Sequence, residues 1–271
     1  MKITIIVFLL SSNALLFGQQ ISGTVFEMDG ETPVEFVNIG VVGKNVGTVS
    51  DRNGNYELLI PAEFHDNTLR FSSIGYHPYS VKVSDFLKLN DGNVRLEQQV
   101  YDMAEVVVRP RRFRERTLGI TTRNPMVSVS WTISSGGEMG ILMKNSKIAF
   151  LKEVNINVMI SPYDTIFCRL NIYKAHKNRQ FENILTNPIY FNFSKEEIKD
   201  RITIDLRHLN LVVAGDFLVT FEFVEMKSSS GRQIFFPASL FSRSYYRKTS
   251  QGEWTTPVAA ISLSVLVDAE R

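Results

Sequence analysis

The sequence predicts an all-β protein built as two successive β-sandwiches. Apolar and polar residues alternate over many short segments, as they do in strands with one buried face. Turn-forming residues separate these segments at close intervals, which favours antiparallel sheets. Apolar residues make up 44% of the 271 residues, so the chain has enough apolar material to bury sizeable cores.

The charge balance is close to neutral. Lys and Arg total 30 against 28 Asp and Glu, which gives a formal net charge of +2. Charged residues make up 21% of the chain, as is usual for folded proteins, and this composition excludes disorder over most of its length. A nucleic-acid partner recruited by bulk positive charge is not expected.

Residues 1–18 are expected to be a secretory signal peptide. Lys2 supplies the positive start, the run from Ile3 to Leu10 is almost entirely apolar, and Gly18 offers a small residue for cleavage. The run is shorter than the roughly 20 apolar residues that span a bilayer, so an uncleaved anchor is the less favoured alternative. Export to the periplasm, the outer membrane or the cell surface follows.

The single cysteine, Cys168, excludes an intramolecular disulfide. It alternates with Ile166, Leu170 and Ile172, which places it on the apolar face of a strand. We therefore expect a buried, unreactive thiol, since a reactive cysteine needs exposure and a stabilised thiolate.

Residues 19–108 predict a small antiparallel sandwich. A hairpin turn is expected between two of its strands, at Asp51–Gly54, where Gly54 suits a positive φ. A calcium loop over Asp51, Asn53 and Asn55 is the alternative, but position twelve is Ala62 instead of Glu. The expected strands are 21–26, 36–41, 47–50, 56–60, 68–75, 79–83 and 94–96.

These residues also carry a resemblance. Gly23-Thr24-Val25, Pro33-Val34, Val37-Asn38, Gly47-Thr48 followed by Asp51-x-x-Gly54-x-Tyr56, Pro61, and Phe71-Ser-Ser-Ile-Gly-Tyr76 resemble the carboxypeptidase regulatory-like domain. The resemblance implies a prealbumin-like β-sandwich, an accessory module common in exported proteins of Bacteroidetes, and implies no peptidase activity. The segment Tyr101–Arg109 is similar to the one that often follows this domain.

Residues 109–125 are expected to be a linker between the domains. Five arginines lie in eight residues there, at Arg109, Arg111, Arg112, Arg114 and Arg116. Such a cluster is able to contact acidic glycans, lipid headgroups or nucleic acid. We favour a solvated linker because the segment is short and the remaining chain is not basic.

Residues 126–271 predict a second sandwich with a jelly-roll-like arrangement of about eight strands. A strand is expected at Met126–Ile133, and Ser194 with Glu197 has the spacing of a capping box before a short helical turn. The strands with the clearest alternation are 154–160, 166–172, 202–207, 217–223 and 261–267. The likeness to jelly-roll accessory domains, some of them carbohydrate-binding, is architectural only.

Aromatic residues give the only candidate ligand site. Trp254 lies in the loop-like stretch Ser250–Pro257, and Tyr245 and Tyr246 precede it closely. Flat aromatic faces stack on sugar rings, so these three residues are the candidate ligand-binding residues. The alternative is that they pack in the core or at its rim, as do most aromatic residues of a sandwich.

No motif for catalysis, a cofactor or a metal is recognisable. His65, His77, His176 and His208 lack the spacing of zinc ligands, and no nucleophile elbow or phosphate-binding loop is present. We therefore predict no catalytic, cofactor-binding or metal-binding residues. The expected function is that of an exported, non-catalytic binding or assembly protein of the bacterial cell envelope.

Its expected partner is an envelope protein or a glycan, with an association with outer-membrane receptor systems as a further expectation. The alternative function is an envelope hydrolase of peptides or glycans with a dispersed active site, which would need two carboxylates about 5–9 Å apart on a concave face.

Overall fold

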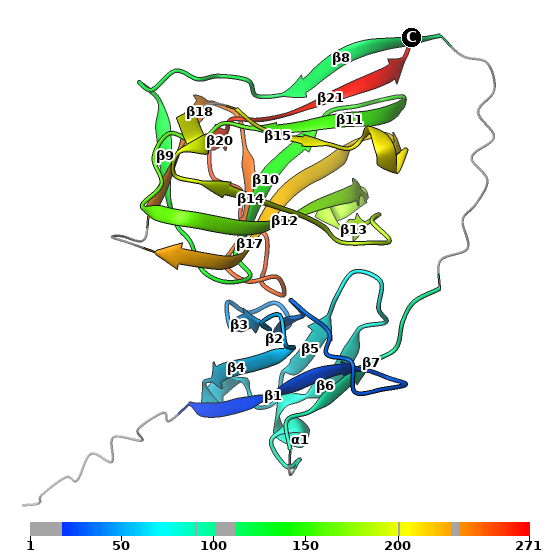
Figure 1. Cartoon of the computed structure of the whole chain (residues 1–271), viewed down its shortest axis with the longest axis vertical. Coiled ribbons are helices and arrows are strands. Elements are labelled where there is room, and N and C mark those ends of the chain that lie inside the picture. The colour runs from blue at the N-terminus through cyan, green and yellow to red at the C-terminus, as the bar shows by residue number, and fades with distance from the viewer. Residues whose placement is uncertain (1–17, 90, 101–111, 200, 229–232) are drawn as a thin grey trace, which may run out of the picture.

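The computed structural model describes residues 18–271 except 90, 101–111, 200 and 229–232. The expected signal peptide, apart from Gly18, and the segment 101–109 lie outside the described residues. The described residues form 21 strands and one four-residue α-helix, so the predicted all-β sandwich fold is confirmed. Figure 1 shows a smaller N-terminal domain below a larger C-terminal one.

Two sheets face each other in the first domain. One has the order β4-β1-β7 and the other β3-β2-β5-β6. Side chains alternate between core and solvent along β4, where Tyr56, Leu58 and Ile60 are buried. The elements are β1 (Gln19–Glu27), β2 (Asn38–Val41), β3 (Gly47–Val49), β4 (Asn55–Ile60), η1 (Ala62–Phe64), β5 (Thr68–Ser72), β6 (Tyr79–Lys82), α1 (Val83–Phe86) and β7 (Val94–Leu96).

The predicted turn at Asp51–Gly54 joins β3 to β4, but the expected hairpin is wrong, because β3 pairs with β2 and β4 with β1 in the facing sheet. Asp51 Oδ1 accepts hydrogen bonds from the backbone N–H groups of Asn53 and Asn55, both at 2.8 Å. Gly54 has φ +74°, a conformation that disfavours residues with a Cβ atom. The Asp51 carboxylate is thus used within the turn itself, as turn chemistry predicts.

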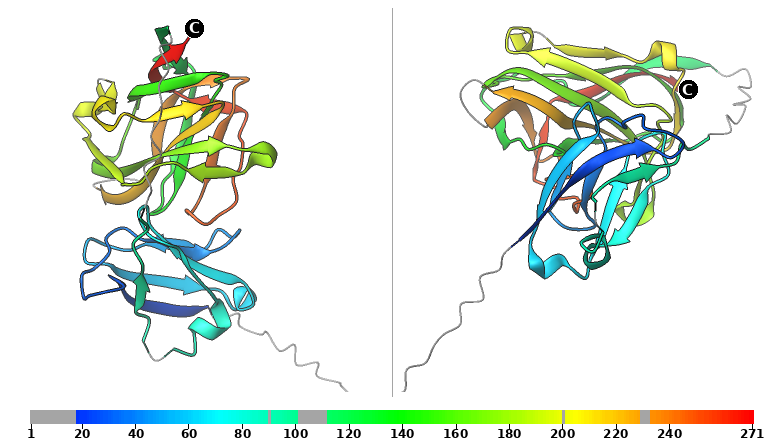
Figure 2. Two further views of the ribbon diagram at one scale, coloured as in Figure 1. Left: turned by 90° about the vertical axis from the view of Figure 1, so that its right-hand side faces the viewer. Right: turned by 60° about the horizontal axis from the view of Figure 1, so that its bottom comes forward.

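The second domain is a larger sandwich around one core. One sheet has the order β13-β12-β17-β10-β19, with β14 also on β12, and the facing sheet has the order β15-β11-β21-β8, with β16 also on β11. A third sheet, β20-β18-β9, adds to the same core. Both large sheets combine strands that are far apart in the sequence, as in a jelly roll (Figures 1 and 2).

The elements of this domain are β8 (Phe113–Gly119), β9 (Ser128–Thr132), β10 (Glu138–Met143), β11 (Ile148–Ile156), β12 (Tyr163–Ala175), η2 (Lys177–Arg179), β13 (Phe181–Asn183), β14 (Ile189–Ser194), η3 (Glu197–Lys199), β15 (Ile202–Asp205), η4 (Arg207–Leu209), β16 (Val212–Ala214), β17 (Phe217–Ser228), β18 (Gln233–Leu240), β19 (Ser244–Arg247), β20 (Ala259–Ile261) and β21 (Leu263–Glu270). The capping box precedes η3 as predicted. The backbone N–H of Ser194 donates to Glu197 Oε2 at 2.6 Å, and the N–H of Glu197 donates to Ser194 Oγ at 3.4 Å.

The expected linker 109–125 needs a correction. Residues 113–119 form β8, which pairs with β21 from Phe113 opposite Glu270 to Gly119 opposite Ser264. The many charged side chains of this segment gave no apolar alternation from which a strand could be predicted. The strand forms because its backbone hydrogen-bonds to β21 at the edge of the sheet. Phe113 packs on Phe150, with ring centroids 5.1 Å apart. The second domain therefore begins before residue 126.

The two domains pack against each other through Phe36. The Phe36 ring lies 5.3 Å from that of Phe167 and 5.4 Å from that of Tyr190, both in the second domain. Its backbone adopts φ +53°, which is strained for a bulky residue. Buried Val49 and Val224 complete this small apolar cluster. The packing fixes the first domain over the outer face of the β12–β17 sheet.

Candidate functional site

The outer face of the β12–β17–β10–β19 sheet carries a buried polar network. Strand alternation directs Cys168, Leu170 and Ile172 into the core, and the intervening residues of β12 face the other way. Cross-strand pairing then sets Arg169 opposite Glu222 and Glu138 opposite Arg247. The members of the network are Glu138, Arg169, Asn171, Tyr173, Thr220, Glu222 and Arg247.

Glu138 is the centre of this network and is fully buried. Its Oε1 accepts hydrogen bonds from Asn171 Nδ2 at 3.0 Å, from the Tyr173 hydroxyl at 2.8 Å and from the Thr220 hydroxyl. Its Oε2 accepts one from Arg247 Nε at 2.7 Å. Both carboxylate oxygens therefore accept hydrogen bonds from neighbouring side chains, and a buried carboxylate with these partners stabilises the folded structure.

Arg169 and Glu222 form a buried ion pair that extends to the first domain. Both side chains are 1% exposed. Arg169 Nε and Nη2 donate to Glu222 Oε2 at 3.1 and 2.9 Å, and Nη1 donates to the backbone carbonyl of Phe36 at 2.9 Å. Burial raises the pKa of Glu222, and the charge of Arg169 opposes that rise. The guanidinium thus links the sheet to the strained residue of the first domain.

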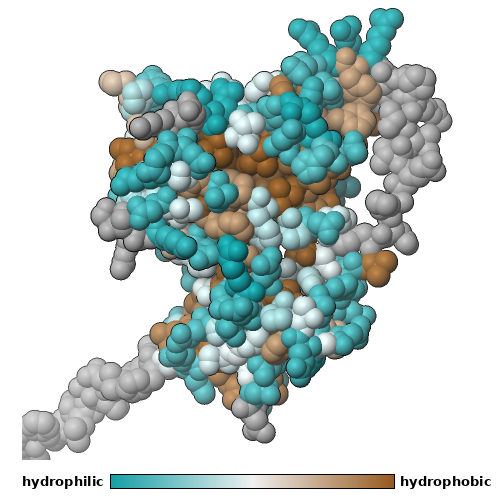
Figure 3. Space-filling view, in the orientation of Figure 1, coloured by the Kyte–Doolittle hydropathy of each residue, from teal (hydrophilic) through white to brown (hydrophobic). Residues whose placement is uncertain are grey.

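A cleft of about 510 Å³ opens at the domain junction beside this network. Asn38, Arg70 and Ser72 line it from the first domain. The second domain contributes Arg169, Asn171, Tyr173, Phe181, Glu182, Asn183, Leu185, Arg247, Ser250 and Gln251. Gln251 Nε2 donates to Ser72 Oγ at 2.8 Å across the junction. On the face shown in Figure 3, hydrophilic side chains predominate where the domains meet, and apolar side chains form a band across the second domain.

Three buried polar atoms, two in the cleft lining and one in the network beside it, have no hydrogen-bond partner within the described part of the chain. They are Asn38 Oδ1, Ser250 Oγ and Glu222 Oε1. Two of them accept only, and the hydroxyl both donates and accepts. An unpaired buried polar group costs about 1–3 kcal/mol, so a further hydrogen-bond partner at these atoms would stabilise the structure.

Two of the three predicted ligand-binding residues meet in an aromatic cluster beside the cleft. The Trp254 ring lies 6.4 Å from that of Tyr245, 5.7 Å from that of Phe181 and 6.1 Å from that of Tyr173. The Arg247 guanidinium lies over the Trp254 ring at 4.4 Å. Trp254 and Tyr245 are half-buried, whereas Tyr173 and Phe181 also line the cleft.

Tyr246 lies apart from the other two predicted residues. Successive residues of β19 point to opposite faces, so Tyr246 turns toward the core, where it packs on Trp131. It is 9% exposed. Tyr246 therefore belongs to the packing of the sandwich, which was the alternative for the aromatic residues.

Sequence reasoning missed the polar members of the site. Arg169 and Asn171 were visible as polar residues alternating with the apolar face of β12. Alternation alone assigns such residues to solvent, because the sequence does not show that another domain covers that face. The cross-strand register that pairs Arg169 with Glu222 is likewise not readable from either strand alone.

The remaining candidates for chemistry are dispersed or enclosed. The described residues contain no group of three or more His, Cys, Asp and Glu side chains able to hold a metal ion. Cys168 is fully buried, and burial raises the pKa of its thiol well above the usual value. Glu138 and Glu222 both contact Asn171 Nδ2, at 3.0 and 3.3 Å, but neither is among the residues that line the cleft. Among the described residues, no helix has the length and apolarity needed to cross a membrane.

Comparison with known proteins identifies the first domain. Residues 21–108 match the CarboxypepD_reg-like domain family, so this part of the chain is a CarboxypepD_reg-like domain, a generic β-sandwich module. The match confirms the resemblance at the level of the domain and ends before β8 begins.

Comparison of the whole chain gives only distant likenesses. No curated protein matches the chain. Among solved structures, the chain is similar to that of the infectious bursal disease virus Gt strain, with 14% identity, 94% of this chain and 77% of that chain covered, and a TM-score of 0.22. It is also similar to T=1 particles derived from infectious bursal virus, with 9% identity, 94% and 74% covered, and a TM-score of 0.24. At these TM-scores the likeness carries no argument.

Proposed function

We propose that the chain is an exported, non-catalytic glycan-binding protein of a bacterial cell envelope, of the kind found in Bacteroidetes. It acts in the periplasm or at the outer membrane, where an association with receptor systems fits its first domain. The cleft at the domain junction takes the glycan, and the first domain contributes one wall of that cleft. The CarboxypepD_reg-like domain is then part of the binding site in addition to being a docking module.

The observation that carries this proposal is the pairing of unsatisfied buried polar atoms with half-buried aromatic rings. Sugar hydroxyls donate to acceptors such as Asn38 Oδ1 and accept from guanidinium groups such as that of Arg70, which lines the same cleft. The apolar face of a sugar ring packs on an aromatic face such as that of Trp254. Polar groups of both kinds and flat rings are the chemistry that a neutral sugar needs.

The environment of the carboxylates near the cleft favours glycan binding over glycan hydrolysis. A glycosidase needs one carboxylic acid and one carboxylate that reach the scissile bond. Both oxygens of Glu138 are held by the network, and Glu222 is held by Arg169. Glu182 is the carboxylate that lines the cleft, and it lies 2.8 Å from His176 Nε2.

The test uses the mature chain on a glycan array, followed by calorimetry with the best glycan. Trp254→Ala is expected to weaken binding about tenfold, because a lost stacking ring is worth about 1–1.5 kcal/mol. Phe241→Ala is the matched control, since this exposed aromatic residue belongs neither to the cleft lining nor to the aromatic cluster around Trp254. It should leave the affinity within about twofold.

Ser250→Ala separates binding from folding. Its hydroxyl is buried and has no hydrogen-bond partner among the described residues, so its removal should leave the free energy of unfolding unchanged or raised while glycan affinity falls. An array with no bound glycan, or full affinity in both Trp254→Ala and Ser250→Ala, would refute the proposal.

A further inference from the structure

The arginine-rich junction places two cations on one face of an edge strand. In β8, Arg114 and Arg116 point to one side and Glu115 to the other. Glu115 is drawn to Lys152, with 2.7 Å between its Oε2 and the Lys152 Nζ. The carboxylate that lies between the two arginines in the sequence therefore forms its ion pair on the opposite side of the strand.

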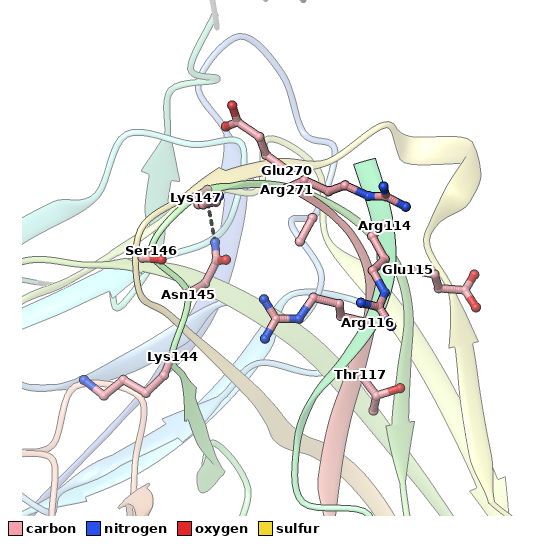
Figure 4. A pocket seen from close by; sticks show the side chains of 11 residues that line it. Arg114, Glu115, Arg116, Thr117, Lys144, Asn145, Ser146, Lys147, Glu270 and Arg271 are labelled. Carbon is pink, nitrogen blue, oxygen red and sulfur yellow. Dashed lines mark hydrogen bonds between the residues drawn. The ribbon is translucent and has the colours of Figure 1, made fainter. Parts of the chain in front are cut away.

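Further cations from two other segments face the same side. The turn between β10 and β11 supplies Lys144 and Lys147, and Arg271 follows β21. Together with β8 they line a pocket of about 790 Å³ at the end of the second domain remote from the first (Figures 1 and 4). The pocket is thus separate from the cleft at the domain junction.

Most of these cations have no carboxylate partner among the residues that the structure describes. Within the described part of the chain, no carboxylate forms an ion pair with Arg114, Arg116, Lys147 or Arg271, whereas Lys144 binds Asp216 at 2.7 Å. Figure 4 shows the carboxylates of Glu115 and Glu270 directed away from Arg116. Like charges gathered in a concave site create a local positive potential that attracts anions.

We propose that this pocket binds a small ligand or headgroup that carries several phosphate groups. Guanidinium groups match phosphate oxygens with pairs of parallel hydrogen bonds, and Arg114 with Arg116 offers two of them on one face. Several cations around one pocket suit more than one phosphate. None of the described residues that line the pocket is aromatic, so these residues offer no platform on which nucleic-acid bases could stack.

The experiment measures two sources of the same chemistry. Calorimetry with inositol hexakisphosphate tests a soluble polyphosphate. Co-sedimentation with vesicles of cardiolipin in phosphatidylcholine, against pure phosphatidylcholine, tests a lipid headgroup, because the cardiolipin headgroup carries two phosphates. The test variant is Arg114→Gln with Arg116→Gln. The matched control is Arg201→Gln with Arg243→Gln, two exposed arginines outside the pocket.

We expect the wild type to bind and the test variant to lose at least about tenfold in affinity, with the control within about twofold. Binding should weaken as salt rises, because the contacts are between exposed charges. Binding to inositol hexakisphosphate alone assigns a soluble ligand, and binding to vesicles alone assigns a headgroup; each supports the proposal. Equal losses in both variants, no binding in either arm, or a pocket-dependent preference for duplex DNA would overturn it. Unchanged circular dichroism of both variants excludes unfolding as the cause.

Discussion

Arginine has two different roles in the two ends of the second domain. At the domain junction, Arg169 and Arg247 are each paired with a buried glutamate, and Arg169 also binds a backbone carbonyl of the first domain. At the remote end, Arg114 and Arg116 are exposed and lack a carboxylate partner among the described residues. Enclosed, paired arginines hold the structure together, and exposed, unpaired ones are available to a ligand.

The difference follows from what covers each strand. β12 lies inside its sheet, and the first domain is packed over its outer face, so a charge there must carry its own counter-charge. β8 is an edge strand whose charged side chains reach water. Removal of an arginine should therefore have opposite consequences for stability at the two places.

Arg169→Met should give the largest effect. It leaves the Glu222 carboxylate buried without its guanidinium, and breaking such a pair costs about 3–5 kcal/mol. Urea unfolding at pH 7 measures this loss. A destabilisation below about 1 kcal/mol would show that the pair does not hold the junction together.

The pH dependence of that variant has a defined sign. Burial already raises the pKa of Glu222, and loss of the Arg169 charge removes the main opposing influence. An acid with a folded-state pKa above its unfolded value adds stability that is fully present below the unfolded pKa and is lost as pH rises through the folded pKa. Arg169→Met should therefore be less destabilised at pH 5 than at pH 8. Adding Glu222→Leu should recover most of the loss and abolish this dependence.

The sequence specified the buried side of this sheet better than the outer one. Alternation correctly assigned Cys168, Leu170 and Ile172 to the core, because burial within a strand is a local property. It did not reveal that Arg169 is buried, because that depends on a domain whose nearest contact, Phe36, lies 133 residues away. It also missed β8, since an edge strand needs only backbone pairing and little apolar sequence.

The candidate site was predictable in part for the same reason. Trp254 was predictable because an aromatic residue in a loop-like stretch is visible locally, and Tyr245 was predicted because it precedes that stretch closely. Tyr246 was predicted on the same ground as Tyr245, but alternation along β19 directs the two side chains to opposite faces of the sheet. Asn38 and Ser250 carried no sequence signal, because they meet only where the domains pack.

Phe36→Ala should have the next largest effect and act on the junction itself. It removes the ring that contacts Phe167 and Tyr190, at an expected cost of about 2–3 kcal/mol for a small apolar cluster. The domains should then unfold in two separate transitions and become cleavable between them by protease. Phe26→Ala is the control, because Phe26 belongs to the same domain and lies outside the junction cluster. Equal behaviour of the two variants would refute the role of Phe36.

Arg114→Gln with Arg116→Gln should change stability far less, and in the other direction. Removing two unpaired like charges relieves repulsion, so the free energy of unfolding should rise by less than about 0.5 kcal/mol. The gain should fade at 1 M salt, where the screening length is only about 3 Å. Urea unfolding at low and high salt measures it. A clear destabilisation would show that Arg114 and Arg116 stabilise the fold as Arg169 does, and would contradict the difference between the two ends of the domain.

Asp216→Asn should give the smallest effect on stability. It changes a paired cation of the basic pocket, Lys144, into an unpaired one. Burial raises the pKa of Asp216, but hydrogen bonds from Lys144 and from the Asn145 N–H bring it below the usual 3.8. An acid with a lowered pKa adds stability that is present above its unfolded pKa and is lost as pH falls through the folded pKa. The free energy of unfolding of the variant should therefore be lower than that of the wild type by a few tenths of a kcal/mol at pH 7, and the two should be equal near pH 2. The substitution also frees Lys144, which lines the basic pocket. The affinity for inositol hexakisphosphate should therefore rise about two- to threefold, although the free energy of unfolding falls slightly. Weaker binding would show that the number of unpaired cations does not set the affinity of this pocket.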